Sequence, residues 1–430
     1  MQITNLLQFR QQIYHLLDQA KDAQFELLEA LVTSGQIGSF VELSVSQFHH
    51  RQWHSAYAAL ERGTIDEVAW RDLTVSLLPQ QAIQVFALDG SIWIHQRART
   101  LQGLVLEPIA DKSRRVPCHL YSSLCYIPEA HRSWALPMNT QRVAWVGTEA
   151  QIGIAQIADL CQRKRAQHDE SLTVITADGR YGGTPFLQPA CELACVCVVR
   201  LRCDRVLYTA PPPYSGFGRP RVHGNKFDFE DPDTWHDPDE TQILAHDRYG
   251  QVHLQVWHNL HAKNAPQAWF SVIRAQVHCA DPNKTQVRWL AIINYPDNYE
   301  LATIWQWYDY RYSIEPNFRF RKQNLHWTRP QFQQTRLCDR WTTFLDIALW
   351  MLYLAREDVA DSPLPWQPPQ PYPTPQRVKQ ALPILLARLP TLTSPPKPRG
   401  KSPGWQKGRR RTPPIRHPVM IRSTTTTTST

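Results

Sequence analysis

Residues 82–89 read AIQVFALD, a short apolar run that ends in an aspartate. Runs of this length and composition are typical of buried β-strands. The preceding residues 1–78 instead have the 3.6-residue periodicity of helices, and Thr64 to Glu67 match the capping box that opens a helix. The change of period at residue 82 therefore predicts a helical N-terminal region followed by a sheet.

The predicted sheet continues well beyond this first strand. A second apolar run, SLTVITAD (171–178), also ends in an aspartate. Further strands are expected at 119–127, 132–138 and 194–202, and a helix is expected at 149–165. The order of three strands, a helix, a strand, a second helix and a strand predicts an α/β fold with a mixed sheet flanked by helices.

The rest of the chain divides into further regions. Residues 203–282 combine alternating segments with long loops, which indicates a β-rich insertion. The segment VRWLAIIN (287–294) is expected to return to the sheet, and helices follow it. The predicted regions are 1–78, helical; 79–202 and 283–361, the two parts of the core; 203–282, the insertion; and 362–430, a Pro-rich linker with a disordered basic tail.

Positive charge is concentrated in that tail. The chain has 47 Lys and Arg and 38 Asp and Glu, a formal net charge of +9. After Asp361 there are twelve Lys and Arg and no acidic residue, so the remaining 35 basic and 38 acidic residues give the body a net charge of −3. Basic arms of this kind usually contact nucleic acid or another polyanion.

The composition argues against a membrane or disulfide-rich secreted protein. The longest apolar run, IALWMLYLA (347–355), is too short to span a bilayer, and the N-terminal residues do not resemble a signal peptide. None of the nine cysteines forms a CxxC pair, so a zinc ribbon is not expected. We therefore expect a cytoplasmic protein whose cysteines are mostly buried free thiols.

Two predicted strands end in the carboxylates Asp89 and Asp178, and a glycine follows each. Sites in α/β sheets gather at the carboxyl ends of strands, so the two aspartates are candidates for one site. An Asp-Gly pair is also a common simple turn, and this alternative stays open.

A third candidate carboxylate lies in YDYRYSIEPNFRFRK (308–322), where Glu315 stands among cations and aromatic rings. One interpretation is a solvated helix in which Glu315 pairs with Arg311 and Arg319 at i,i+4 spacing. The other is that the carboxylates hold hard divalent cations while the Arg and Lys side chains hold phosphates. Pro316 follows Glu315 directly, so the helix either kinks there or begins near Glu315.

Four residues of this stretch carry a resemblance to a known family. Tyr308, Arg311, Glu315 and Lys322 match the Y-x2-R-x3-E-x6-K signature of one group of bacterial insertion-sequence DDE transposases. The resemblance extends over residues 82–357, and the 136 residues between Asp178 and Glu315 would hold the β insertion of that group. It implies a ribonuclease H-like catalytic core.

By this resemblance Asp89, Asp178 and Glu315 form a catalytic triad that binds two Mg²⁺ ions, with Mn²⁺ as an alternative. Tyr308, Arg311 and Lys322 would contact the DNA near the cut. Arg319 is a further candidate for DNA binding in the same stretch. The stretch FGRPRVHG (217–224) resembles a basic loop of such transposases, which adds Arg219 and Arg221; a Gly-Pro surface turn is the alternative reading of that loop.

The resemblance implies a transposase that hydrolyses the phosphodiester at element ends and transfers the freed strand to target DNA. Its partners would be double-stranded DNA and a second copy in a synaptic homodimer, in the cytoplasm and associated with the nucleoid. The N-terminal helices could contribute to end binding. The alternatives are a non-catalytic DNA-binding protein, either a decayed transposase or a regulator, and a simple nuclease on the same fold.

The loop 228–240 is a rival metal site, because it has seven carboxylates. Its prolines and its irregular ligand spacing favour a solvated acidic loop instead.

Overall fold

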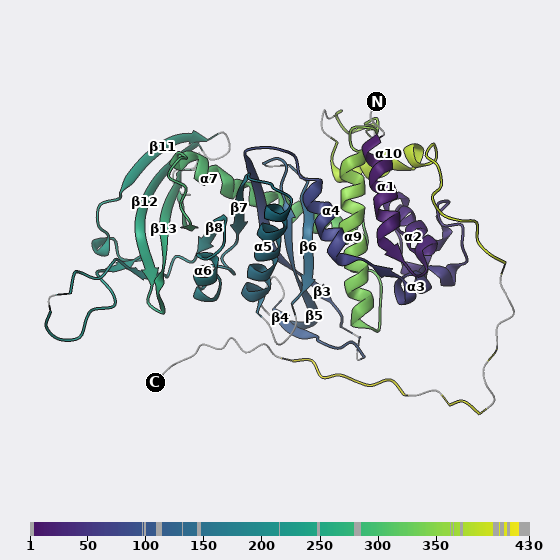
Figure 1. The fold of residues 1–430 in the computed structure, drawn as a ribbon, viewed down its shortest axis with the longest axis horizontal. Coiled ribbons are helices and arrows are strands. Elements are labelled where there is room, and N and C mark those ends of the chain that lie inside the picture. Colours follow the sequence, from purple (N-terminus) through teal and green to yellow (C-terminus); the bar gives the residue numbers. More distant parts are fainter. Residues whose placement is uncertain are drawn as a thin grey trace.

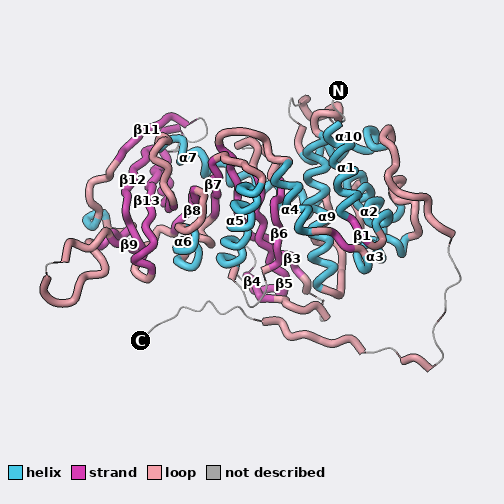
Figure 2. The backbone as a smooth tube through the Cα atoms, in the orientation of Figure 1, coloured by secondary structure: helices cyan, strands magenta, loops and turns pink. Residues whose placement is uncertain are grey.

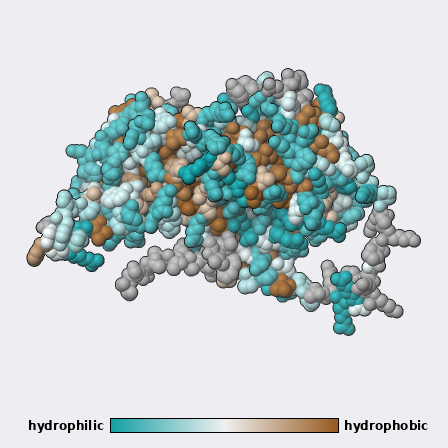
Figure 3. Space-filling view, viewed as in Figure 1, coloured by the Kyte–Doolittle hydropathy of each residue, from teal (hydrophilic) through white to brown (hydrophobic). Residues whose placement is uncertain are grey.

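The computed structural model shows an elongated molecule with a helical region at one end and long strands at the other (Figure 1, Figure 2). The structure describes residues 4–420 except 97, 99, 109–113, 131, 144–147, 215, 247–249, 279–284, 362, 364, 370–372, 399–403, 405–407, 411 and 412. Hydrophilic side chains cover most of the face in Figure 3, and apolar residues form small separate areas on it.

The N-terminal region is helical, as the periodicity predicts. It contains α1 (Thr4–Leu16), α2 (Lys21–Thr33), the 3-10 turn η1 (Phe40–Val45), α3 (Trp53–Arg62) and α4 (Glu67–Ser76), and a two-residue ribbon pairs β1 (Leu17–Asp18) with β2 (Thr64–Ile65). The expected capping box is wrong in detail. Asp66 caps α4 by accepting hydrogen bonds from the backbone of Val68 and Ala69, because Thr64 is held in the ribbon.

A continuous twelve-stranded sheet follows. Its strands are β3 (Ile83–Ile94), β4 (Val105–Pro108), β5 (Arg115–Tyr126), β6 (Leu136–Arg142), β7 (Leu172–Ala177), β8 (Val196–Leu201), β9 (Val206–Tyr208), β10 (Lys226–Asp228), β11 (Glu240–His246), β12 (Gly250–Ala262), β13 (Ala265–His278) and β14 (Thr285–Ile293). Their order is β10-β9-β12-β13-β14-β8-β7-β3-β5-β4, with β11 beside β12 and β6 beside β5.

The sheet is mixed, and its centre is parallel. The pairs β3–β7 and β7–β8 are parallel, whereas the neighbouring pairs β3–β5 and β8–β14 are antiparallel. The expected β-rich insertion is present, and β14 hydrogen-bonds to both β13 and β8, so the inserted strands extend the central sheet.

Alternation along the central strands separates two apolar layers. Ile175 on β7 packs with Ile157 of α5 (Glu149–Ala166) in one cluster, which also includes α6 (Thr184–Ala190). Val174, the preceding residue, packs in a second cluster with Trp305 of α7 (Leu301–Asp309). Successive side chains of a strand point to opposite faces, so the sheet is covered by helices on both sides.

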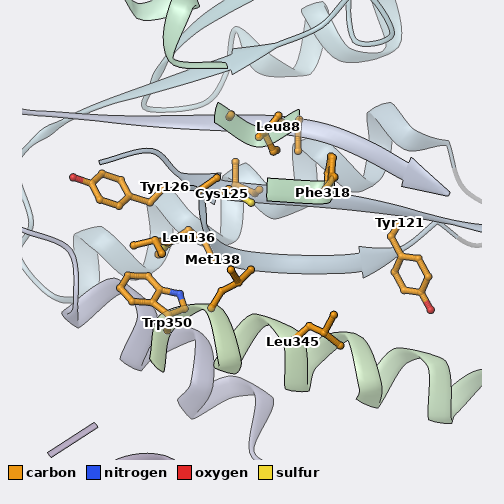
Figure 4. Close-up of a cluster of buried hydrophobic side chains, with 14 of the residues drawn as sticks. Leu88, Tyr121, Cys125, Tyr126, Leu136, Met138, Phe318, Leu345 and Trp350 are labelled. Atoms are coloured by element: carbon orange, nitrogen blue, oxygen red, sulfur yellow. The ribbon is translucent and has the colours of Figure 1, made fainter. Parts of the chain in front are cut away.

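The longest helix, α9 (Thr335–Ala355), joins the sheet to the N-terminal helices. Figure 4 shows its residues Leu345 and Trp350 facing Leu136 and Met138 of β6. All four side chains are buried. None of the helices in the described part of the chain is long and apolar enough to cross a membrane.

The prediction that residues 362–430 form a linker and a disordered tail is wrong for its first half. Residues Pro375–Leu386 form α10, which packs on α2 and α9 and buries Val378 and Leu382. Lys379 donates to the backbone oxygen of Ser34, and Thr393 donates to Glu26 (3.1 Å). The high proline content led to the prediction of a linker. The segment instead contains an amphipathic helix whose apolar face completes the N-terminal bundle.

Part of the later tail also contacts the sheet. Met420 pairs with Val105 of β4 through backbone hydrogen bonds of 3.1 Å to Leu104 and Leu106. The residues after Met420, which include the final Thr-rich run of the predicted tail, lie outside the described residues.

Candidate functional site

The two predicted aspartates lie side by side on the parallel strands β3 and β7. Leu88 is in register with Ala177, and Asp89 and Asp178 are the next residues on each strand. Asp178 follows the end of β7 and stabilises a turn, because its carboxylate accepts from the backbone N–H of Arg180 (2.9 Å). The strand pattern therefore brings two carboxylates to one point, as predicted.

Asp89 does not end its strand, and here the prediction is wrong. β3 runs on through Gly90 to Ile94, and Asp89 pairs with Ser123 of β5. The Asp-Gly pair is therefore not a turn at this position. A Cβ at residue 90 would lie 1.9 Å from Oε1 of Glu149, so the glycine makes room for that carboxylate.

Glu315 reaches the same place from a helix. The chain passes from α7 through the 3-10 turn η3 (Tyr310–Ser313) into α8 (Ile314–Gln323), so a new helix begins one residue before Glu315. Pro316 then occupies the first turn of α8, where its missing N–H costs no helical hydrogen bond. Of the two alternatives for Pro316, the structure has the helix start.

Arg311 connects the carboxylates. Its Nη1 donates to Asp89 Oδ2 (2.8 Å) and its Nη2 donates to Glu315 Oε1 (2.9 Å). The side chains of Arg311 and Asp89 are 15% and 13% exposed, whereas Glu315 is 51% exposed. The guanidinium therefore ties a buried strand carboxylate to an exposed helical one. Arg311 and Glu315 form the i,i+4 ion pair that the solvated-helix interpretation predicted. Arg311 also pairs with Asp89, which lies 222 residues away in the sequence.

The electrostatics of Asp89 show how closely the negative groups are gathered. Burial, followed by repulsion from Asp178, raises the pKa of Asp89 to about 6, against the opposing attraction of Arg311. Burial disfavours the charged form of Asp89, and the neighbouring Asp178 adds a smaller effect in the same direction.

Glu149 is a fourth carboxylate at this site, and the sequence reasoning missed it. It is the first residue of α5, and it pairs with Arg180 (3.2 Å). Burial raises its pKa to about 7, Arg180 opposes the shift, and Asp178 and Asp89 add to it. Its only sequence signal is a position at the start of a helix between the two aspartate strands.

Tyr308 belongs to the site, and the other predicted cations lie at increasing distance from it. Tyr308 is buried, and its hydroxyl hydrogen-bonds with Arg311. Arg319 is exposed one turn beyond Glu315. Lys322 lies two turns along α8, about 10 Å from Glu315 by helical rise, and it is half-buried, which lowers the pKa of its ammonium group.

Arg219 and Arg221 lie elsewhere. They are exposed in the loop between β9 and β10, near the edge of the sheet, and five strands separate β9 from β3. The loop projects from the strand-rich end of the molecule (Figure 1). The structure does not bring them near Asp89.

The acidic loop is held by local pairs. Asp228 pairs with Lys226 (2.7 Å), and Asp239 accepts from the backbone of His258 (2.7 Å). Within the described ranges, no group of three metal-ligand side chains with ligand atoms within 4.8 Å of one another comes from this loop.

The residues around Arg311 fit a hard divalent cation. They supply carboxylate oxygens, which Mg²⁺ and similar ions prefer. Asp178 contributes to the raised pKa of Asp89 through charge repulsion, which a bound cation would relieve. In the structure Arg311 supplies the positive charge between Asp89 and Glu315. Within the described residues, Asp89, Asp178 and Glu315 do not form a group of three with ligand atoms within 4.8 Å of one another.

Carboxylates gathered on neighbouring strands of a mixed α/β sheet are typical of nucleases that cut phosphodiesters with metal ions. A family model described as DDE superfamily endonuclease matches residues 11–263, more than half of the chain. The chain belongs to this DDE endonuclease superfamily, whose members generally use divalent metal ions. The match contains Asp89, Glu149 and Asp178, whereas Arg311 and Glu315 lie beyond it. No curated protein matches the chain.

Proposed function

We propose that this nuclease is a transposase of the insertion-sequence type. It would cut the phosphodiester at the ends of a DNA element and use the freed 3′-hydroxyl to attack target DNA. The observation that carries the proposal is the meeting of Asp89, Asp178 and Glu315 around Arg311, from parts of the chain far apart in sequence. The Y-x2-R-x3-E-x6-K spacing supports transposition beyond simple cutting.

Asp89, Asp178 and Glu315 would hold divalent ions, Mg²⁺ first and Mn²⁺ as the alternative. When bound, two such ions activate an attacking water and stabilise the leaving oxygen of an in-line displacement. Arg311 orients Asp89 and Glu315 through one hydrogen bond to each. Tyr308 holds Arg311 in place from the buried side.

Glu149 has a different role in this proposal. A carboxyl with a pKa of about 7 exchanges its proton near neutral pH, which suits proton transfer beside the cut. Its ion pair with Arg180 holds the group next to Asp178.

DNA would lie along the exposed side of α8. Arg319 is exposed one turn after Glu315, and Lys322 is half-buried on the next turn; both would hold phosphates beside the cut. Arg219 and Arg221 would hold a more distant part of the duplex. Two copies of the chain would bring a pair of ends together in a synaptic homodimer.

The tail would supply attraction that does not depend on sequence. After Ser394, the last residue of the α10 region with a hydrogen bond to the helical bundle, nine Lys and Arg remain and no acidic residue follows. Truncation after Ser394 should make the log–log salt dependence of DNA binding shallower by ~0.9 for each phosphate that the tail neutralises. Because this truncation keeps α10, and the two backbone hydrogen bonds of Met420 that it removes lie at the sheet edge, the melting temperature should change little. An unchanged slope would show that the tail is no DNA arm.

The catalytic test uses duplexes that carry the inverted repeats flanking the gene, if such repeats exist. Asp89→Asn, Asp178→Asn and Glu315→Gln should each reduce Mg²⁺-dependent cleavage by more than about 100-fold, the upper cost of disturbing only an outer-shell partner of a metal ligand. The control is Glu357→Gln, which neutralises an exposed carboxylate away from the site.

Binding and strand transfer separate the alternatives. Cleavage without joining to target DNA would favour a simple nuclease. DNA binding without any metal-dependent cleavage by the parent protein would favour a non-catalytic regulator. Normal cleavage by any one of the three variants would remove that residue from the proposed triad.

A further inference from the structure

A second group of metal-ligand side chains lies away from the carboxylates. His95 follows the end of β3, His119 lies on β5, and Cys338 lies in the first turn of α9. One ligand atom from each residue lies within 4.8 Å of the other two, and all three residues are buried. It is the one such group within the described residues.

The strand register explains how the two histidines meet. His119 pairs with Trp93 across β3 and β5, and the backbone N–H of His95 donates to Pro117 (2.9 Å). Their ring centroids are 4.9 Å apart. α9 then packs its N-terminal turn beside them, which places the Cys338 thiol against both rings.

The hydrogen bonds of His119 leave one nitrogen free for a ligand bond. Its Nε2 lies 3.0 Å from the backbone oxygen of Gln102, so this nitrogen carries the proton and donates it. Nδ1 is buried and has no hydrogen-bond partner. Metal-binding histidines commonly have this arrangement, in which the non-ligating N–H donates to a backbone carbonyl and fixes the tautomer.

His95 is still less satisfied. It is 2% exposed, and neither Nδ1 nor Nε2 has a hydrogen-bond partner. Buried polar groups in native proteins nearly always have a partner, so three unpartnered imidazole nitrogens on two neighbouring rings call for an explanation. Burial also disfavours the charged form of each ring, so both carry lone pairs at neutral pH.

We propose that His95, His119 and Cys338 form a binding site for a borderline-soft transition-metal ion of the Zn²⁺ class. Two imidazole nitrogens and one thiolate are ligands that Zn²⁺ accepts and Mg²⁺ does not. On binding, the Cys338 S–H bond breaks, the proton passes to solvent and the sulfur–metal bond forms. A cavity of about 200 Å³ adjoins His95 and is also lined by Pro117 and, from the tail, His417.

This site is structural and separate from the carboxylates. His95 lies six residues after Asp89, about 20 Å along an extended chain. The ion would cross-link β3 and β5 to α9, and so fix the strand that carries Asp89 to the helix that follows α8 in sequence. The proposal does not depend on the proposed transposase function.

The experiment is a Co²⁺ titration of the metal-free, full-length protein, followed by optical absorption. Co²⁺ takes zinc positions, and a cobalt–thiolate bond adds a charge-transfer band that carboxylate ligands do not produce. Asp178→Asn serves as the background, so that cobalt on the carboxylates contributes little. We expect about one ion per chain with the thiolate band, as for a closed zinc site.

Cys338→Ser should abolish the band, and His119→Gln should weaken the binding by at least 10-fold. Cys197→Ser is the matched control, because it removes another buried thiol, 3.7 Å from that of Cys195. If Cys338→Ser does not fold, X-ray absorption of the cobalt-loaded parent decides, with one sulfur and two imidazoles expected in the shell. A parent protein without the thiolate band, or a band that persists in Cys338→Ser or disappears in Cys197→Ser, would overturn the assignment.

Discussion

Strand β3 contributes to two clusters of reactive side chains, one at Asp89 and one at His95. The buried polar groups of the two clusters are stabilised differently. At Asp89 the buried group is charged, and a guanidinium from another element compensates it. At His95 the buried groups are neutral, and three of the four imidazole nitrogens of His95 and His119 have no hydrogen-bond partner. The comparison teaches that two different signs reveal a buried ligand cluster. For carboxylate ligands the sign is a raised pKa, and for imidazole ligands it is nitrogen atoms without a hydrogen-bond partner.

The two clusters also differ in access. Glu315 is half exposed beside Asp89, so substrate can reach that end of the strand. His95, His119 and Cys338 are all buried, and a cavity of about 200 Å³ adjoins His95. An exposed cluster suits turnover, and a closed one suits a structural ion.

Of the substitutions that distinguish the Asp89 site from the His95 cluster, Arg311→Ala is expected to have the largest effect on stability and cleavage. Loss of the guanidinium leaves Asp89 buried with no cation in contact, which costs about 3 kcal/mol of folding free energy at pH 8. The cost should be smaller at pH 5, where Asp89 is protonated. Cleavage should fall by about 10–100-fold or more, and cobalt binding at the His95 cluster should not change.

Chemical denaturation at the two pH values and a cleavage assay measure these effects. Arg165→Ala is the control, because it removes an exposed arginine near the end of α5 that has no proposed role at the site. Equal effects of the two substitutions would contradict the role given to Arg311.

The second effect is a pH dependence of stability in the presence of a chelator. The pKa of Asp89 is raised to about 6 and that of Glu149 to about 7, so the folded state binds these protons more tightly than the unfolded state. The stabilising effect of protonation is therefore full below the unfolded pKa values near 4 and is lost as the pH rises to 7. The protonation of each group contributes at most about 3 kcal/mol to the free energy of unfolding.

Melting between pH 5 and 8 should show this decline, and Mg²⁺ should reverse it by binding the charged carboxylates. Zn²⁺ at one equivalent should instead stabilise the parent protein and have little effect on Cys338→Ser. A stability that does not change between pH 5 and 8 would contradict the electrostatic description of the Asp89 end.

A smaller effect is expected for Glu149→Gln. Glutamine resembles the protonated acid, so the variant should match the parent only near pH 4, where Glu149 is protonated in both states, and should be more stable at pH 8 by about 2–3 kcal/mol. If Glu149 transfers a proton, cleavage should also lose its pH dependence near 7 and slow by about 100-fold. Equilibrium unfolding and a pH–rate profile distinguish the two contributions, and unchanged profiles would show that Glu149 only fills space.

The smallest effect is expected for Lys322→Ala. A cation that holds one phosphate should reduce the salt slope of DNA binding by about 1 and weaken all sequences alike. Stability should change little. Gel-shift measurements across a salt series provide the test, with Arg165→Ala, an exposed cation near the end of α5, as the control. Identical slopes for parent and Lys322→Ala would remove this residue from the DNA path.

Much of the fold follows from local patterns in the sequence. Apolar runs located β7 and β8, and the Pro316 rule allowed for a helix start near Glu315, because these signals are short-range. The prediction failed where tertiary packing overrides the local signal. Gly90 looked like a turn but is paired within β3, and α10 was masked by prolines although its apolar face is buried.

The site was predicted less completely than the fold. The signature spacing singled out Arg311 and Glu315, and strand ends pointed to the two aspartates. Glu149 and the His95 cluster carry no recognisable spacing, since their members approach one another only when β3, β5, α5 and α9 have packed. Proximity of this kind is a property of topology, and a single sequence does not encode it in any short motif.

The continuity of the sheet has a consequence for the length of DNA that the protein would cover. Six strand-to-strand steps separate β3 from β9, whose following loop carries Arg219 and Arg221. At about 4.8 Å a step, the sheet sets roughly 30 Å between that loop and Asp89. A straight duplex rises about 3.4 Å per base pair, so the two positions would be about nine base pairs apart. Because hydrogen-bonded strands cannot stretch, the sheet would fix the distance along the DNA between the point of cleavage and the contact made by Arg219 and Arg221.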